Sequence, residues 1–373
     1  PVAKDTTATP TNTEFKLGRQ RNYNLNYSVD YVVTQLDNNF INTGYQKFSG
    51  GGSPIYLNAG MNALFKIGLS DLFEDYRIVG AMRFSGDLSS NEFFLSYENR
   101  INNIDRQLIL HRQALINVSN DAASLTKIHT YEAKYVWKFP ISEVLGLRGT
   151  VGYRNDRTIY LSTDDNNLRR PDTYENWGNL KVEYVFDNTI ARGLNLYNGI
   201  RAKLFGEYYR QIDKKETDFF VIGFDARGYK KIHRDFIWAN RLAGSTSFGN
   251  KKLIYYMGGV DNWFTPRFDN TTNIATDQNY AYQTLATSMR GFYQNVRNGN
   301  SFVVFNSELR FPIFKYLYKR PIRSDFIQNF QIVGFYDLGT AWTGSSPYSS
   351  DNSLNYKVIG TNNPIVQSVI SNV

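Results

Sequence analysis

The chain has 373 residues, a formal net charge of +8, no cysteine and an aromatic content of 16%. It contains no run of 18 apolar residues, which excludes a transmembrane helix. A membrane β-barrel stays compatible with low hydropathy, because every second residue of its strands faces a polar lumen. Without cysteine there is no disulfide or thiol chemistry. The positive charge is spread along the chain with no recognised nucleic-acid-binding motif, so a nucleic-acid partner is not expected.

Residues 1–21 are predicted to be a linker or N-terminal extension, because their first part is rich in Thr, Ala and Pro and has no apolar period. From residue 22 onward, apolar and aromatic residues alternate with polar ones, and a period of two predicts β-strands. One such run places Glu132 and Lys134 between Tyr131, Ala133 and Tyr135. Charges of both signs in mid-strand are typical of a wet lumen, and aromatic residues near strand ends are typical of membrane interfaces. We therefore predict an all-β, antiparallel transmembrane β-barrel over residues 22–373.

The connections between the predicted strands have two lengths. Short turns are expected at 70–74, 99–105, 141–144 and 229–234, and long polar loops at 37–54, 118–126, 164–171 and 250–300. If strands alternate in direction, all the long loops lie at one end, which is the extracellular end in outer-membrane barrels. We predict about thirteen strands here and about 16 in the complete protein, because such barrels normally have an even number. The chain ends in a polar segment, so the closing C-terminal strands are predicted to be missing.

Three short motifs follow one another near the C-terminal end. They are Met289-Arg290-Gly291-Phe292, Glu308-Leu309-Arg310-Phe311-Pro312 and Phe335-Tyr336-Asp337-Leu338-Gly339-Thr340-Ala341-Trp342. The period of two places Phe335 and Asp337 on one face of their strand. If the last two runs pair as neighbouring strands, Glu308 and Asp337 can face the same side, where Arg290 can reach both. A guanidinium can pair carboxylates through charge-assisted hydrogen bonds.

These motifs resemble the surface-antigen barrel of the BamA/TamA superfamily, the outer-membrane insertases and translocators. Gly258-Gly259 is similar to the Gly-Gly that precedes the sixth loop of the family, and the long insert 260–289 departs from its pattern. The resemblance implies that the long loop 248–300 folds back into the lumen. There Arg290, Gly291 and Phe292 would form a latch. Its partners on the lumen wall would be Glu308, Phe335 and Asp337. The remaining positions of the family motifs are Pro312, Gly339 and Trp342. The family's POTRA domains are absent from this chain.

The resemblance implies a non-enzymatic protein of a Gram-negative outer membrane that assists insertion or translocation of proteins. Its expected partners are membrane lipids, other outer-membrane or periplasmic envelope proteins and client polypeptides. The alternative is a structural barrel that anchors a larger envelope complex, for example one fused to a periplasmic propeller, with a plugged, non-conducting lumen. A lipid-acting or lipase-exporting barrel is a third hypothesis. It would be favoured by a serine and a histidine converging in one loop, and no such pair is evident.

No catalytic residue, metal site or cofactor is predicted. Glu308 and Asp337 have no neighbouring nucleophile that would mark an acid–base pair. The histidines are scattered without metal-binding spacing, at His111, His129 and His233. Two further groups leave alternatives open. Oxygen ligands in the long loop could bind Ca²⁺ or be simply solvated: Asp261, Asp269, Asn270 and Asp277. Cations in a predicted periplasmic turn could contact lipid head groups or be solvated: Lys315, Lys319, Arg320 and Arg323.

Overall fold

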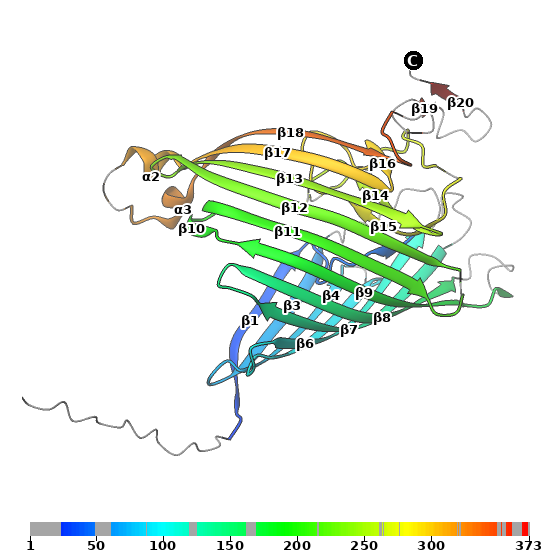
Figure 1. Ribbon diagram of the computed structural model, residues 1–373, viewed down its shortest axis with the longest axis horizontal. Coiled ribbons are helices and arrows are strands. Elements are labelled where there is room, and N and C mark those ends of the chain that lie inside the picture. The colour runs from blue at the N-terminus through cyan, green and yellow to red at the C-terminus, as the bar shows by residue number, and fades with distance from the viewer. Residues whose placement is uncertain are drawn as a thin grey trace, which may run out of the picture.

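The computed structural model describes residues 24–48, 61–86, 88–118, 125–161, 169–214, 216–260, 263, 265–275, 277–318, 320, 322–348, 352, 356–359 and 368–371. Its main feature is one 14-stranded antiparallel sheet, strongly curved, in which sequence neighbours pair (Figure 1). Thirteen strands follow one another in the order β1 (Tyr27–Asp37), β3 (Asn62–Asp71), β4 (Tyr76–Ser85), β5 (Asn91–Asn99), β6 (Asp105–Val118), β7 (Leu125–Pro140), β8 (Leu145–Tyr160), β9 (Thr173–Asp187), β11 (Leu196–Gln211), β12 (Asp218–His233), β13 (Phe236–Gly249), β17 (Ser301–Phe311) and β18 (Ile332–Trp342).

The predicted all-β antiparallel fold is confirmed, and so is the number of about thirteen strands in this chain. The short β10 (Ile190–Gly193) pairs with β11 beside this series. The first strand begins at Tyr27 rather than at residue 22. Among the described residues no pairing joins β1 to β18, so the two ends of the series are edge strands. No described helix is long and apolar enough to cross a membrane.

The alternation of residues separates two faces of the sheet. In β7, Thr130 and Glu132 are buried on the inner face, while Tyr131 and Trp137 on the outer face are 43% and 39% exposed. The same pattern recurs along the other long strands, so the outer face carries a band of exposed large apolar side chains. An apolar outer band and a polar inner wall are typical of membrane barrels, because the outer face contacts lipid.

The short turns lie at one end of the sheet, but not all connections there are short. The turn predicted at 229–234 is narrower, because β12 continues to His233 and β13 begins at Phe236. The predicted turn after β17 is wrong: it is a 20-residue connection that contains α2 (Ile313–Leu317) and α3 (Asp325–Asn329). Strand β17 ends at Phe311 because Pro312 has no N–H to continue the ladder. Figure 1 shows α2, α3 and β10 together at this end.

A second sheet is built from the long connections of the opposite end. Its order is β16 (Arg297–Gly299), β14 (Lys252–Met257), β15 (Tyr280–Leu285) and β2 (Gln46–Lys47), and we call it the loop sheet. β14 and β15 are parallel. A separate pair, β19 (Tyr356–Ile359) and β20 (Ser368–Ser371), lies near the C-terminus.

The main hydrophobic core lies between the loop sheet and the inner wall. Its buried members from the wall are Trp177, Tyr209, Phe219, Val221, Phe302, Val304 and Ala341, and those from the long loop are Leu253, Tyr255, Met257, Ala281, Tyr282, Ala286 and Met289. A wall strand that packs apolar residues inward must cover them with protein, since the lumen of an open barrel is wet. The loop sheet provides that cover.

Candidate functional site

Arg290 lies at the centre of the first candidate site. Its guanidinium donates from Nε to Asp337 Oδ2 (2.8 Å), from Nη2 to Asp337 Oδ1 (2.7 Å) and from Nη1 to Glu308 Oε1 (2.6 Å). The backbone N–H of Arg290 also donates to Asp337 Oδ2, at 2.9 Å. One carboxylate therefore holds both the side chain and the backbone of the loop residue. We call Arg290 with Glu308, Phe335 and Asp337 the latch.

Strand register explains how the wall residues of the latch meet. Glu308 pairs with Phe335 and Asn306 pairs with Asp337, so the two carboxylates are diagonal neighbours on one face. The guanidinium carbon of Arg290 lies 4.0 Å from the ring centroid of Phe335. Asn306 Nδ2 donates to Asp337 Oδ1 (2.8 Å) and to the carbonyl of Ser288 (3.1 Å). The wall thus contacts both the arginine and the residue two positions before it.

The charges of the latch are balanced by a second arginine. Arg310 donates from Nε to Glu308 Oε2 at 2.8 Å, and its Nη1 donates to the carbonyl of Asn195. Hydrogen bonding to Asp337 raises the pKa of Arg290 above its usual value. The loop residue therefore stays charged at any physiological pH. Since the side chain of Asp337 is 2% exposed and that of Arg290 is 23% exposed, the pair is largely shielded from water.

The glycine motif joins the same loop through backbone contacts. Gly259 N donates to Phe292 O and Met289 N donates to Gly259 O, both at 2.9 Å. Phe292 is 46% exposed, and its carbonyl accepts from Gly259 rather than from a residue of the latch. Gly258 has φ +106° and lies so close to Tyr293 that an added Cβ would be 2.0 Å from the Tyr293 carbonyl oxygen. A side chain at this position cannot be accommodated without moving the loop.

The remaining motif positions shape the wall beneath the loop. A Cβ at Gly339 would lie 2.8 Å from Val304 Cγ2, so β18 approaches its neighbours closely there. Trp342 ends β18, and its carbonyl lies against Gly299 of β16. Pro312 is remote from the arginine and ends β17. The structure thus brings Arg290, Glu308, Phe335 and Asp337 together, and the other motif residues surround or terminate the elements that carry them.

Replacing Gly258 by alanine is expected to destabilise the loop by about 2 kcal/mol, through backbone strain and the clash with the Tyr293 carbonyl. Thermal unfolding in detergent measures the effect. The matched control is Gly291→Ala, which also has positive φ (+86°) but no neighbouring atom within 4 Å of the added Cβ. The control should cost about 1 kcal/mol. Equal effects of the two substitutions would show that the close approach at Gly258 is unimportant.

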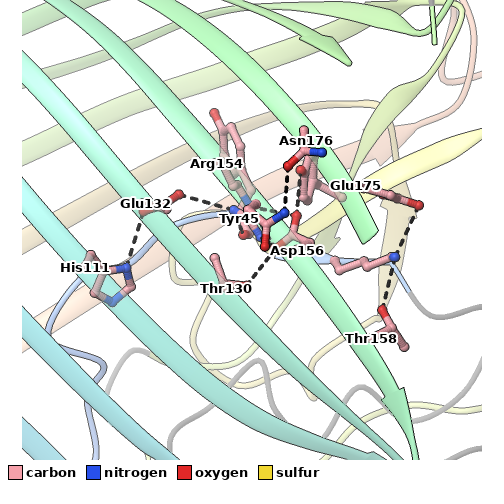
Figure 2. Close-up of polar contacts among 12 residues, drawn as sticks. Tyr45, His111, Thr130, Glu132, Arg154, Asp156, Thr158, Glu175 and Asn176 are labelled. Carbon is pink, nitrogen blue, oxygen red and sulfur yellow. Dashed lines mark hydrogen bonds and ion pairs between the residues drawn. The ribbon is translucent and has the colours of Figure 1, made fainter. Parts of the chain in front are cut away.

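A second polar cluster, which the sequence did not predict, lies on the inner wall of β4 to β8, and Figure 2 shows its members on β6 to β8. We call it the wall network, consisting of Arg83, Glu92, His111, Glu132, Arg154 and Asp156, all less than 9% exposed. The imidazole ring of His111 lies between two carboxylates: Nε2 is 2.8 Å from Glu92 Oε1, and Nδ1 is 3.3 Å from Glu132 Oε2. Both ring nitrogens face acceptors, an arrangement that favours the doubly protonated ring.

Arg154 connects the wall network to both loop segments. It donates to both oxygens of Asp156 from Nε (3.1 and 2.9 Å), and from Nη1 to Glu132 (3.4 Å) and to the Tyr45 carbonyl (2.5 Å). The hydroxyl of Tyr282 in the loop sheet donates to Asp156 Oδ2 at 2.8 Å, and its ring lies 4.4 Å from the guanidinium carbon. One buried arginine therefore touches the wall, the first loop and the long loop.

The first loop is tied to the same wall by its backbone. The N–H groups of Ile41 and Asn42 donate to the carboxylate of Glu92, at 3.0 and 2.9 Å. Lys47 in β2 lies 3.2 Å from Glu175 and donates to Thr158 at 3.2 Å. The one signal in the sequence was the set of charged residues at inward positions of neighbouring strands. Their partners could not be assigned without the register between β4 and β8.

Within the described parts of the chain, the candidate calcium ligands, the histidines and the basic residues after β17 are not brought together. No group of three His, Cys, Asp or Glu side chains in the described parts of the chain could hold a metal ion. Asp269 accepts from the backbone and hydroxyl of Thr271, Asp277 accepts from Gln278, and Asp261 lies outside the described residues. The histidines lie in separate surroundings: His129 lies beside Arg112, and His233 contacts Tyr316. Lys319 lies outside the described residues, and Lys315 pairs with Asp235 at 3.3 Å.

Comparison with known proteins gives matches in structure but none in sequence. No family model and no curated protein sequence matches the chain. BamA from Haemophilus ducreyi lacking POTRA domains 1–3 matches with a TM-score of 0.53 and 15% identity, over 84% of this chain and 63% of that one. CdiB from Acinetobacter baumannii matches with a TM-score of 0.43 and 13% identity, over 87% of this chain and 51% of that one. The chain thus spans less than two thirds of the BamA structure that it matches. Its curved antiparallel sheet is similar in fold to the barrel of BamA.

Proposed function

We propose that this chain is the barrel of an outer-membrane protein of the BamA/TamA type, which assists insertion or translocation of polypeptides. The observation that carries the proposal is the latch: the loop motif reaches the strand motifs of β17 and β18 within a BamA-like fold. The latch holds the long loop on the inner face next to β18, one of the two edge strands. A loop fixed at that place can guide a client to an edge without itself being displaced.

The edge strands support the same proposal. Along β18 large apolar residues are exposed on both faces, with Phe335 at 55%, Tyr336 at 60% and Leu338 at 57%. An edge strand presents unpaired N–H and C=O groups, which are a template for pairing with another strand. Client strands are therefore proposed as partners, together with membrane lipids at the outer face. The role requires no cofactor and no enzymatic step.

A second candidate function is a structural barrel that anchors a larger envelope complex. It is favoured by the loop sheet, whose fully buried Leu253 packs in one core with the buried wall residues Trp177 and Phe219. A lumen filled in this way is non-conducting as long as the loop sheet stays in place. Under this proposal the latch fixes the plug, and the partners are other envelope proteins.

A crosslink across the seam separates the two functions. The chain has no cysteine, so one cysteine is placed at Tyr27 in β1 and a second in the last barrel strand of the full-length protein. Cells carrying the oxidised pair are assayed for assembly of outer-membrane proteins. If the barrel acts as an insertase, locking the seam stops assembly, and reduction restores it. Continued assembly with a fully formed crosslink would rule out seam opening and leave the anchor. Each single-cysteine variant is the control.

A further inference from the structure

The outer face of the sheet is hollowed over β3 to β8. A groove of about 540 Å³ lies there, and it is lined on the membrane side by exposed apolar and aromatic residues. Its low points are at Gly80 and Ala133, which have little or no side chain. Its rims are formed by the larger residues Phe65, Met82, Phe93, Leu110, Tyr131 and Tyr153. Neighbouring strands are about 4.8 Å apart, so six strands span a width of roughly 24 Å. One extended acyl chain would not fill this width.

Arg112 is the one arginine or lysine among the residues that line this groove, which also include His111 and Glu132 of the wall network. Register places it between Phe93 of β5 and Tyr131 of β7, on the loop side of the groove. Its guanidinium carbon lies 5.5 Å from the Phe93 ring centroid, Nη1 donates to Asn91 Oδ1 (2.5 Å), and Nη2 is 3.2 Å from His129 Nδ1. A permanent charge on a lipid-facing wall is costly unless it reaches the head-group level and an anion there.

Two more cations lie beside Arg112 on the same outward face. His129 lies 3.2 Å from Arg112, pairs across the strands with Arg157 and follows Lys127 by two residues on the same face, so the three cations are clustered around it. Arg157 is paired with Asp172 at 2.6 Å. Among the described residues neither Arg112 nor Lys127 has an acidic partner, so the described part of this face carries a net positive patch.

The aromatic residues show at which depth this patch lies. Tyr131, Tyr153 and Tyr174 face outward and are 43%, 46% and 55% exposed. Exposed tyrosines mark the membrane–water interface, because the ring is apolar and the hydroxyl is wet. Lys127 and His129 precede Tyr131 on the way down from the loop end of β7. The cations therefore lie at or above the interface, and the apolar groove extends from this level toward the turn-bearing end.

We propose that this face binds a phosphate-bearing lipid with several acyl chains, of the lipid A type, in the leaflet at the loop-bearing end. The phosphates contact Arg112 and Lys127, and the acyl chains lie in the groove over Gly80 and Ala133. A bare apolar wall would accept any lipid chain, and it is the positive charge at the head of the groove that selects phosphate. The inference requires that the strands cross a membrane, but not that the barrel handles clients.

Native mass spectrometry of the full-length protein in detergent tests this site. The probes are lipid A with two phosphates, the same lipid without phosphates, and phosphatidylglycerol. The unaltered protein is expected to retain one phosphorylated lipid A. The double variant Arg112→Gln/Lys127→Gln should bind it roughly 30-fold more weakly, the combined effect of two basic residues near a membrane surface. A second variant, Ala133→Phe, fills the groove on a membrane-facing position and should also displace the lipid.

Arg106→Gln is the matched control, because Arg106 lies on the same strand and face as Arg112 but near the turn-bearing end. It should leave lipid A retention unchanged. Far-ultraviolet circular dichroism checks that every variant keeps its strand content. Three results would overturn the proposal: equal retention of phosphorylated and unphosphorylated lipid A, equal retention of phosphatidylglycerol, or an effect of the double variant no larger than that of the control.

Discussion

Replacing Arg290 by alanine is expected to release the long loop from the wall of the barrel. The substitution removes three side-chain hydrogen bonds and leaves Asp337, which is 2% exposed, with only Asn306 and the loop backbone as partners. Removing one member of a buried ion pair costs about 3–5 kcal/mol. Because the guanidinium is 23% exposed, we expect the lower end, about 3 kcal/mol. Such a loss makes local opening of the loop about 100-fold more frequent.

A cysteine in place of Met289 measures this opening. Met289 is 7% exposed and precedes the arginine, and the chain contains no other thiol. In the parent protein the thiol should react slowly with a maleimide, and in Arg290→Ala about 100-fold faster. Arg310→Ala is the control, because it removes a contact to Glu308 without touching the loop. Arg290→Lys should be intermediate, since it keeps the charge and loses the planar fork. Slow labelling in all variants would mean that the loop is held by its hydrophobic contacts alone.

The latch contacts could be anticipated from the sequence because they depend on features of single strands. Every second residue of a strand lies on the same face, so the sequence predicts the face of Glu308 within β17 and that of Asp337 within β18. The loop motif lies only 18 residues before Glu308. The number of strands was predicted from the same alternation of apolar and polar residues. Whether the latch acts as proposed is a separate matter, which the labelling experiment addresses.

The interior could not be predicted in the same way. Tyr282 and Asp156 are 126 residues apart in the chain, and no local pattern marks them as partners. The resemblance implies that the long loop folds into the lumen, but its polar sequence does not predict that β14 and β15 form a parallel pair whose side chains contribute to the core. Parallel pairing requires a crossover and leaves no hairpin signal in the sequence. The helices α2 and α3 were missed because each has only five residues, too few for a helical period.

The largest loss of stability is expected from Arg154→Ala in the wall network. The side chain of Arg154 is 4% exposed and that of Asp156 is not exposed at all. Alanine would leave two carboxylates, Asp156 and Glu132, without this cation in a shielded interior, and would free the Tyr45 carbonyl. Breaking a fully buried pair costs about 3–5 kcal/mol, and we expect the upper half of that range. Thermal unfolding in detergent should show a lowered transition temperature.

Arg148→Ala is the control for this experiment. Arg148 lies on the same strand and the same inner face, but its side chain is 43% exposed and its contact to Glu183 is 3.3 Å long. Exposed pairs contribute about 0–1 kcal/mol, so the control should change little. The double variant Arg154→Met/Asp156→Asn should recover part of the loss, because it removes the unpaired charge together with its partner. If the double variant is no more stable than Arg154→Ala, the cost arises from lost packing of the long side chain rather than from an unpaired carboxylate. In that case the wall network positions the two loops by shape, and its charges have little part in holding them.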